Sequence, residues 1–77
     1  MSESAPTETI IVAFVHGLSD SDTVVREICA AALGKCGARA KPALETLQKL
    51  ANSDDAAADF AKSAVRQIEA ATPVQGK

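Results

Sequence analysis

Apolar and polar positions along this chain follow the period of an α-helix, in segments separated by polar, glycine-containing or proline-containing breaks. The breaks lie at Pro6, 19–22, Gly34 and Gly37, Pro42, 52–55 and Pro73. Between them the chain is rich in strong helix formers and lacks the alternation of a β-strand. The helical segments cover residues 7–18, 23–36, 40–51 and 56–71. The pattern therefore predicts an all-α fold of four antiparallel helices.

The two halves of the chain match each other when the sequence is shifted by about 32 residues, which is the signature of an internal repeat. In the first helix of each half, Val12, Val15 and Leu18 fall on Leu44, Leu47 and Leu50. In the second helix, Val25, Ile28, Cys29, Ala32, Leu33 and Cys36 fall on Ala57, Phe60, Ala61, Ala64, Val65 and Ile68. These positions form one apolar stripe along each helix, which predicts two helical hairpins. The predicted repeats are residues 7–37 and 38–71, between a flexible N-terminal segment 1–6 and a flexible tail 72–77.

Local signals support these boundaries. Asp22 and Asp54 stand where a side chain can accept hydrogen bonds from the first amides of a helix. Ser21 and Ser53 are alternative caps if the boundaries move by one residue. Gly37 follows the second helix, where a left-handed residue commonly ends a helix. We also expect Leu33 and Leu47 to form the core between the hairpins.

The string DTVVREICAAALGKCG, residues 22–37, resembles the second-helix signature of HEAT repeats, in particular the short phycobilisome-lyase-like subclass. The string AKPALETLQKL, residues 40–50, is similar to the first helix of that family. The resemblance covers residues 7–71. It implies an α-solenoid of two HEAT-like hairpins, with first helices on the convex side and second helices on the concave side. It also implies a scaffold for protein–protein interaction rather than an enzyme.

The resemblance further implies roles for individual residues. Arg26 would reach Asp54 as an inter-repeat ladder, and the ladder would end at Ala58, where the second repeat lacks the arginine. The concave face would bind a partner protein whose identity is unknown. The residues of this predicted track are Thr23, Glu27, Ala30, Gly34, Asp59, Lys62 and Arg66. Solvated helix surface with charge pairs is the alternative interpretation of the same residues.

The first helix carries more apolar surface than its counterpart in the second half. Ile10, Phe14 and Gly17 correspond to Pro42, Thr46 and Lys49. Helical geometry places Ile11, Val15 and Leu18 toward the hairpin interior, and Ile10 and Phe14 on an uncovered flank. We therefore expect self-association through Ile10, Phe14 and Gly17, in the simplest case as a homodimer. The alternative is that the N-terminal segment folds back over this flank through Ala5 and Pro6.

Composition removes several classes of function. Eight basic and ten acidic residues give a formal net charge of -2, which offers no basic patch for nucleic acid or an anionic membrane. With two Phe and no Trp or Tyr, the chain lacks stacking platforms for bases. The acidic N-terminus and the short apolar run at 10–15 fit neither a secretory signal nor a membrane span. These features predict a cytoplasmic protein.

Candidate catalytic groups are scarce, which predicts a protein without enzymatic activity, cofactor or metal. Cys29 and Cys36 lie about 10.5 Å apart along one helix, too far for a disulfide, and are expected to be buried reduced thiols. His16 is expected to be a solvated surface residue. The aspartates are expected to cap helices, because their spacing matches no calcium loop. The runner-up function, suggested by the resemblance, is an accessory subunit or remnant of a phycobilin lyase, with Cys36 as the attachment point.

Overall fold

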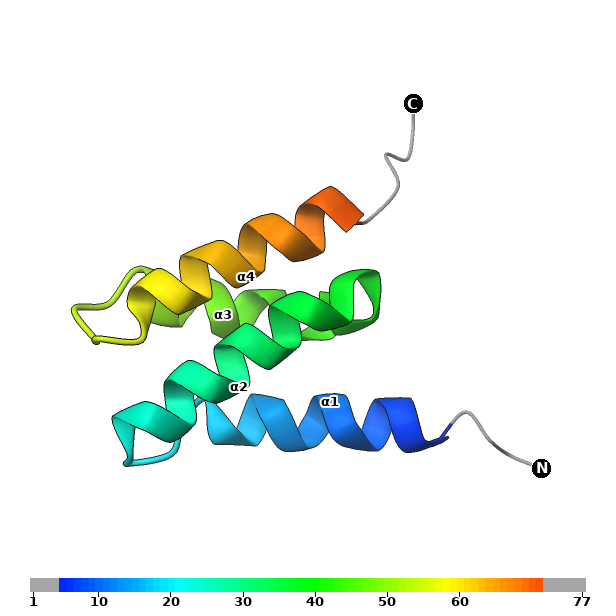
Figure 1. The fold of residues 1–77 in the computed structure, drawn as a ribbon, viewed down its shortest axis with the longest axis horizontal. Coiled ribbons are helices and arrows are strands. Elements are labelled where there is room, and N and C mark those ends of the chain that lie inside the picture. The colour runs from blue at the N-terminus through cyan, green and yellow to red at the C-terminus, as the bar shows by residue number, and fades with distance from the viewer. Residues whose placement is uncertain (1–4, 72–77) are drawn as a thin grey trace.

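The computed structural model describes residues 5–71, all of whose regular secondary structure is helical (Figure 1). The α-helices are α1 (Ala5–Gly17), α2 (Thr23–Cys36), α3 (Leu44–Ala51) and α4 (Ala58–Ala71), and α2 and α3 are joined by the 3-10 helix η1 (Gly37–Ala43). No strand occurs in this part of the chain. The predicted all-α class is confirmed. The predicted tail 72–77 and residues 1–4 lie outside the described residues.

The first helix begins earlier than the sequence pattern predicts. Ala5 and Pro6 belong to the first turn of α1 rather than to a flexible segment 1–6. Proline is well suited to this place, because the first amides of a helix have no partner within the helix and the fixed φ of proline matches the helical one. Since Ala5 and Pro6 are helical, they cannot form a strap that folds back over the flank of α1.

The segment predicted as one helix over 40–51 is divided. Residues Gly37–Ala43 form η1, and regular α-helix begins only at Leu44. Gly37 has a φ of 64°, which favours glycine, and its amide donates to the carbonyl of Gly34 to close α2. Pro42 lies within η1, where it has no amide hydrogen to donate. The chain therefore reverses direction through a tight 3-10 segment instead of a simple loop.

Helices α2 and α4 lie side by side and run in the same direction, and α3 lies behind them against α4 (Figure 1). Helix α1 packs against α2 and runs in the opposite direction, and it also contacts η1. This arrangement is compatible with two helical hairpins. Within residues 5–71, none of the helices has the length and apolar character needed to cross a membrane.

The core lies where α2, α3 and α4 meet. Leu33, Leu47 and Ile68 are the largest fully buried side chains, which confirms the predicted core positions of Leu33 and Leu47. Helix α1 contributes Ile11 and Leu18, which are also buried, as predicted. Most other buried residues are alanines, so the helices approach one another closely and each large core side chain fills space between several elements.

Candidate interaction surfaces

The turn before α2 and the turn before α4 are joined by Arg26. Its Nη1 donates to the carbonyl oxygen of Asp20 at 2.6 Å, and its Nη2 donates to the hydroxyl of Thr23 at 2.9 Å. Its Nε lies 2.9 Å from Oδ2 of Asp55, so the guanidinium and the carboxylate form an ion pair. The guanidinium is largely buried and holds the two turns together.

The prediction that Arg26 reaches Asp54 is wrong by one residue, because its partner is Asp55. The cap of α2 is Asp22, as predicted, whose carboxylate accepts from the Val24 amide at 2.9 Å. At the second turn the same role belongs to Asp55, which accepts from the Ala57 amide at 2.8 Å, while Asp54 is exposed. The two turns are thus equivalent at a shift of about 33 residues rather than 32, because the second turn holds one extra residue.

The carboxylate of Asp55 is kept charged by its surroundings. The amide of Ala57 is the main cause that lowers its pKa, and Arg26 lowers it further, whereas burial acts in the opposite direction. Asp55 therefore combines a helix cap with an ion pair between the turns. The sequence contained this signal in the DD pair at 54–55, but it did not show which of the two aspartates is used.

The predicted concave track is wrong at two of its positions. Ala30 and Gly34 are buried, because α4 crosses α2 on this side. A Cβ built on Gly34 would lie 2.8 Å from Oε1 of Gln67 and 3.0 Å from the Cα of Ala64. Thr23 and Glu27 are half-buried on the same side. Ala30 and Gly34 are therefore packing residues, and their small size allows the backbones of α2 and α4 to come close.

The predicted exposure of the self-association flank of α1 is wrong for two of its three residues, Phe14 and Gly17. Phe14 is half-buried and packs against the hydrophobic core. A Cβ built on Gly17 would overlap the Sγ of Cys29, so Gly17 is where α1 approaches α2. Of the predicted group only Ile10 is exposed, at 49%. At its C-terminal end, α1 therefore packs against α2 through Gly17, on the side that the sequence pattern leaves uncovered.

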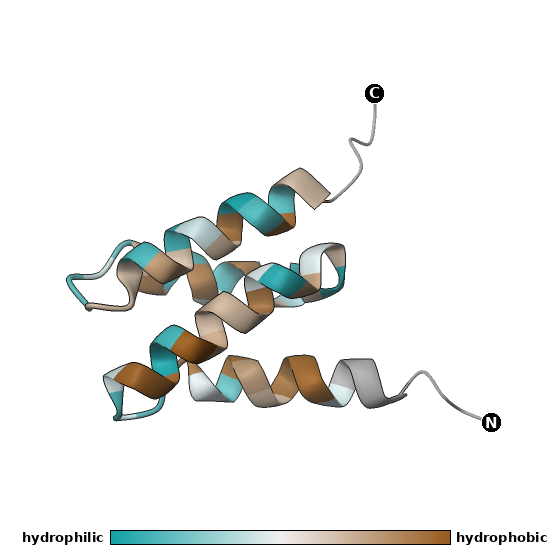
Figure 2. Cartoon of the chain, in the orientation of Figure 1, coloured by the Kyte–Doolittle hydropathy of each residue, from teal (hydrophilic) through white to brown (hydrophobic). Residues whose placement is uncertain are grey.

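Among the described residues, the exposed large apolar side chains are Ile10 and Val12 on α1, Val24 and Ile28 on α2, and Phe60 on α4. Val24 is 57% exposed and Ile28 is 60% exposed, and they are one turn apart on the same side of α2. Phe60 on α4 is 43% exposed. We call these three residues the α2–α4 face. Figure 2 shows that apolar positions are concentrated in α1 and in the first half of α2, whereas polar and apolar positions alternate along α4.

The exposed charges near α2 are separated by sign. Asp20 and Asp22 lie at its N-terminal end, and Lys35 and Arg39 lie at the opposite end. The acidic end coincides with the N-terminus of the helix, where the helix dipole favours negative charge. On α4 the signs are mixed, because exposed Lys62 and Arg66 lie in its middle and exposed Glu69 lies near its C-terminal end.

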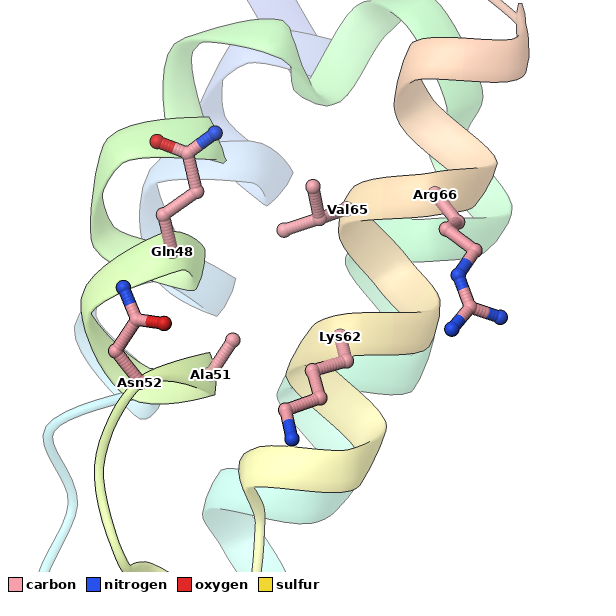
Figure 3. Close-up of a pocket in the computed structure, with 6 residues that line it drawn as sticks. All are labelled: Gln48, Ala51, Asn52, Lys62, Val65 and Arg66. Atoms are coloured by element: carbon pink, nitrogen blue, oxygen red, sulfur yellow. The ribbon is translucent and has the colours of Figure 1, made fainter.

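A shallow recess separates α3 from α4 (Figure 3). Gln48, Ala51 and Asn52 on α3 line one side, and Lys62, Val65 and Arg66 on α4 line the other. In Figure 3 the Lys62 side chain extends along the recess, whereas the Arg66 side chain is turned away from α3. Lys62, Arg66 and Asp59 of the predicted track are all exposed, and Lys62 and Arg66, one turn apart on α4, line this recess beside α3, whereas Thr23 and Glu27 lie on α2. The track is thus not one continuous surface.

The potentially reactive side chains are dispersed. Cys29 is buried, and burial with some help from Asp20 raises the pKa of its thiol. Cys36 is half-buried in a recess with Ile10 and Arg39, and both cysteines are free thiols. His16 is exposed, as predicted. Among residues 5–71, no group of three or more His, Cys, Asp or Glu side chains is placed to hold a metal ion.

Comparisons of the chain with protein-family models, with curated proteins and with solved structures found no match.

Proposed function

We propose that this chain is a non-catalytic protein–protein interaction module, a two-repeat HEAT-like α-solenoid that associates with itself through the N-terminal hairpin. The observation that carries the proposal is the exposure of Val24 and Ile28 on α2, extended by Phe60 on α4. Full burial of an apolar side chain of this size is worth about 1.5–3 kcal/mol. A side chain left half exposed therefore forgoes about 1 kcal/mol, which association would recover.

The repeat correspondence supports the same conclusion. At the shift of 32 residues that aligns the apolar positions of the helices, Ile28 corresponds to Phe60, and both side chains are large, apolar and exposed. A scattered surface apolar residue needs no explanation, but a repeated one on adjacent packed helices is typical of an interaction surface. The proposed surface therefore lies on the second helix of the N-terminal hairpin and not on the first helix, where the sequence pattern predicts it.

The test is the solution mass of the chain over a range of concentrations. Sedimentation equilibrium with interference optics suits a protein without Trp or Tyr. We expect a concentration-dependent dimer that Ile28→Ser reduces to a monomer while its far-UV circular dichroism stays helical. The matched control is Val12→Ser, because Val12 on α1 is 55% exposed but lies outside the α2–α4 face. A wild-type chain that stays monomeric up to millimolar concentration would refute the proposal, and so would an Ile28→Ser chain that still dimerises.

A further inference from the structure

We propose that a recess between α1, the C-terminal end of α2 and η1 binds a small carboxylate that carries an apolar chain, such as a medium-chain fatty acid. We call it the α1–α2 recess, and its lining residues are Ile10, Ile11, Lys35, Cys36 and Arg39. None of them belongs to the α2–α4 face, so the inference does not depend on the proposed self-association. It follows from the size of the recess, its apolar wall and the cations at its rim.

The α1–α2 recess is formed where two antiparallel helices meet the 3-10 segment. The middle of α1 lies beside the C-terminal end of α2 and also contacts η1 (Figure 1). Ile11 belongs to the hydrophobic core and is 5% exposed, whereas Ile10 is 49% exposed. The recess has a volume of about 310 Å³, at the lower end of the range for small-molecule pockets. A ligand of this recess must therefore be small.

The wall of the recess is apolar. It combines buried Ile11, exposed Ile10 and half-buried Cys36, and a free cysteine packs like a small apolar side chain. An alkyl chain lying on this wall would remove from water apolar surface of Ile10 that the folded chain leaves exposed. The wall thus favours a ligand with an apolar chain.

The rim of the recess is basic. Lys35 and Arg39 are exposed, and among residues 5–71 neither side chain has a hydrogen-bond or ion-pair partner. Residues 28–44 include these two cations and Lys41 but no Asp or Glu. The helix dipole favours cations at the end of α2, so their presence alone does not indicate a ligand. Their position beside an apolar recess is what adds a place for an anionic head group.

The two features together define the class of ligand and its affinity. A carboxylate at the rim can accept charge-assisted hydrogen bonds from Lys35 and Arg39, while its chain covers the apolar wall. Octanoate, with about ten non-hydrogen atoms, should bind with a dissociation constant on the order of 1–10 mM at the ligand efficiency of an average ligand. The charge of the head group then determines selectivity more than affinity, because exposed ion pairs are weak.

The test is a titration of the ¹⁵N-labelled chain with octanoate at constant ionic strength, followed by the backbone amide resonances. With octanoate up to about 50 mM, several times the expected dissociation constant, we expect saturable shifts that are largest at Ile10, Ile11 and Cys36. Octylammonium has the same chain and the opposite charge, and it should give no saturable shift at these residues. Bound octanoate should also slow the alkylation of Cys36 by iodoacetamide, but not that of buried Cys29.

Variants of the rim separate the head-group contacts from non-specific binding of the alkyl chain. Lys35→Gln and Arg39→Gln should each raise the dissociation constant about two- to fivefold, as expected for one exposed ion pair. The matched control is Lys41→Gln, which removes the same charge from an exposed residue outside the recess and should leave the dissociation constant unchanged. Far-UV circular dichroism checks that each variant stays helical.

Three results would overturn the α1–α2 recess as a carboxylate site. They are the absence of saturable shifts at its lining residues, equal binding of octylammonium, and unchanged octanoate binding when both rim cations are replaced. None of them bears on the solution mass of the chain, so the proposed self-association is judged separately by sedimentation.

Discussion

Replacing Gly34 by alanine tests whether this residue lies on an open face, as the sequence pattern predicts, or against α4, as in the structure. The sequence pattern places Gly34 on an open concave face, where alanine would stabilise the helix by about 1 kcal/mol because glycine is a poor helix former. The structure places it against α4, where a Cβ would lie 3.0 Å from the Cα of Ala64 and 3.2 Å from its Cβ. The two positions predict opposite signs for the change in stability.

The expected magnitude follows from two opposing contributions. Overpacking a helix contact of this kind costs about 1–3 kcal/mol. We expect the upper part of that range, because two of the contacted atoms belong to Ala64 and one of these is backbone, which cannot rotate away. Subtracting the gain in helix propensity leaves a net loss of about 1–2 kcal/mol. For a domain of this length, that loss corresponds to a melting temperature about 5–15 °C lower.

The assay is thermal and urea unfolding followed by far-UV circular dichroism, since the chain has no Trp or Tyr for fluorescence. The matched control is Lys35→Ala at the next, exposed position, which we expect to change the free energy of unfolding by only a few tenths of a kcal/mol. A Gly34→Ala chain that melts at or above the wild-type temperature would show that α2 and α4 do not make this contact.

Further consequences concern the core, the turns and the thiols. Leu47→Ala should lower the free energy of unfolding by about 2–5 kcal/mol in urea unfolding, a large share of the roughly 4–12 kcal/mol available to a chain of this length, because Leu47 is fully buried. The pKa of Asp55 is lowered in the folded state, so its contribution to stability is complete above the unfolded pKa and is lost as pH falls through the folded pKa. The free energy of unfolding of Asp55→Asn, measured between pH 6 and 2, should therefore depend less on pH than that of the wild type. Arg26→Met should also weaken that dependence, since it removes the cation between the turns. In the native protein a thiol reagent should label Cys36 well before Cys29, and equal labelling rates measured by mass spectrometry would contradict the burial of Cys29.

Much of the fold could be predicted from the sequence, because its signals are local. Helical periodicity gave the all-α class, and capping chemistry gave Asp22 as the start of α2. The core positions of Leu33 and Leu47 followed from the apolar stripe. The 3-10 segment η1 was missed, because a proline just inside a helix and a proline within a tight 3-10 connection produce nearly the same sequence signal.

The one-residue error at Asp54 has a different origin. The shift of about 32 residues was chosen to align apolar positions of the helices, whereas the polar turn can hold an additional residue without disturbing those positions. Two adjacent aspartates can both act as caps on chemical grounds. Only the distance between the turns, which Arg26 spans, selects Asp55.

The candidate surface was misplaced because apolar periodicity assumes that large side chains point inward and small ones outward. Helix α2 has neighbours on two sides, α1 and α4, and its close contacts with them need small residues. Ala30 and Gly34 therefore face α4, and Gly17 faces Cys29, while the larger Ile28 is displaced to the outside. Because α2 contacts α4 through small residues, large apolar side chains such as Ile28 are left exposed on its outer side, and the proposed self-association would cover them.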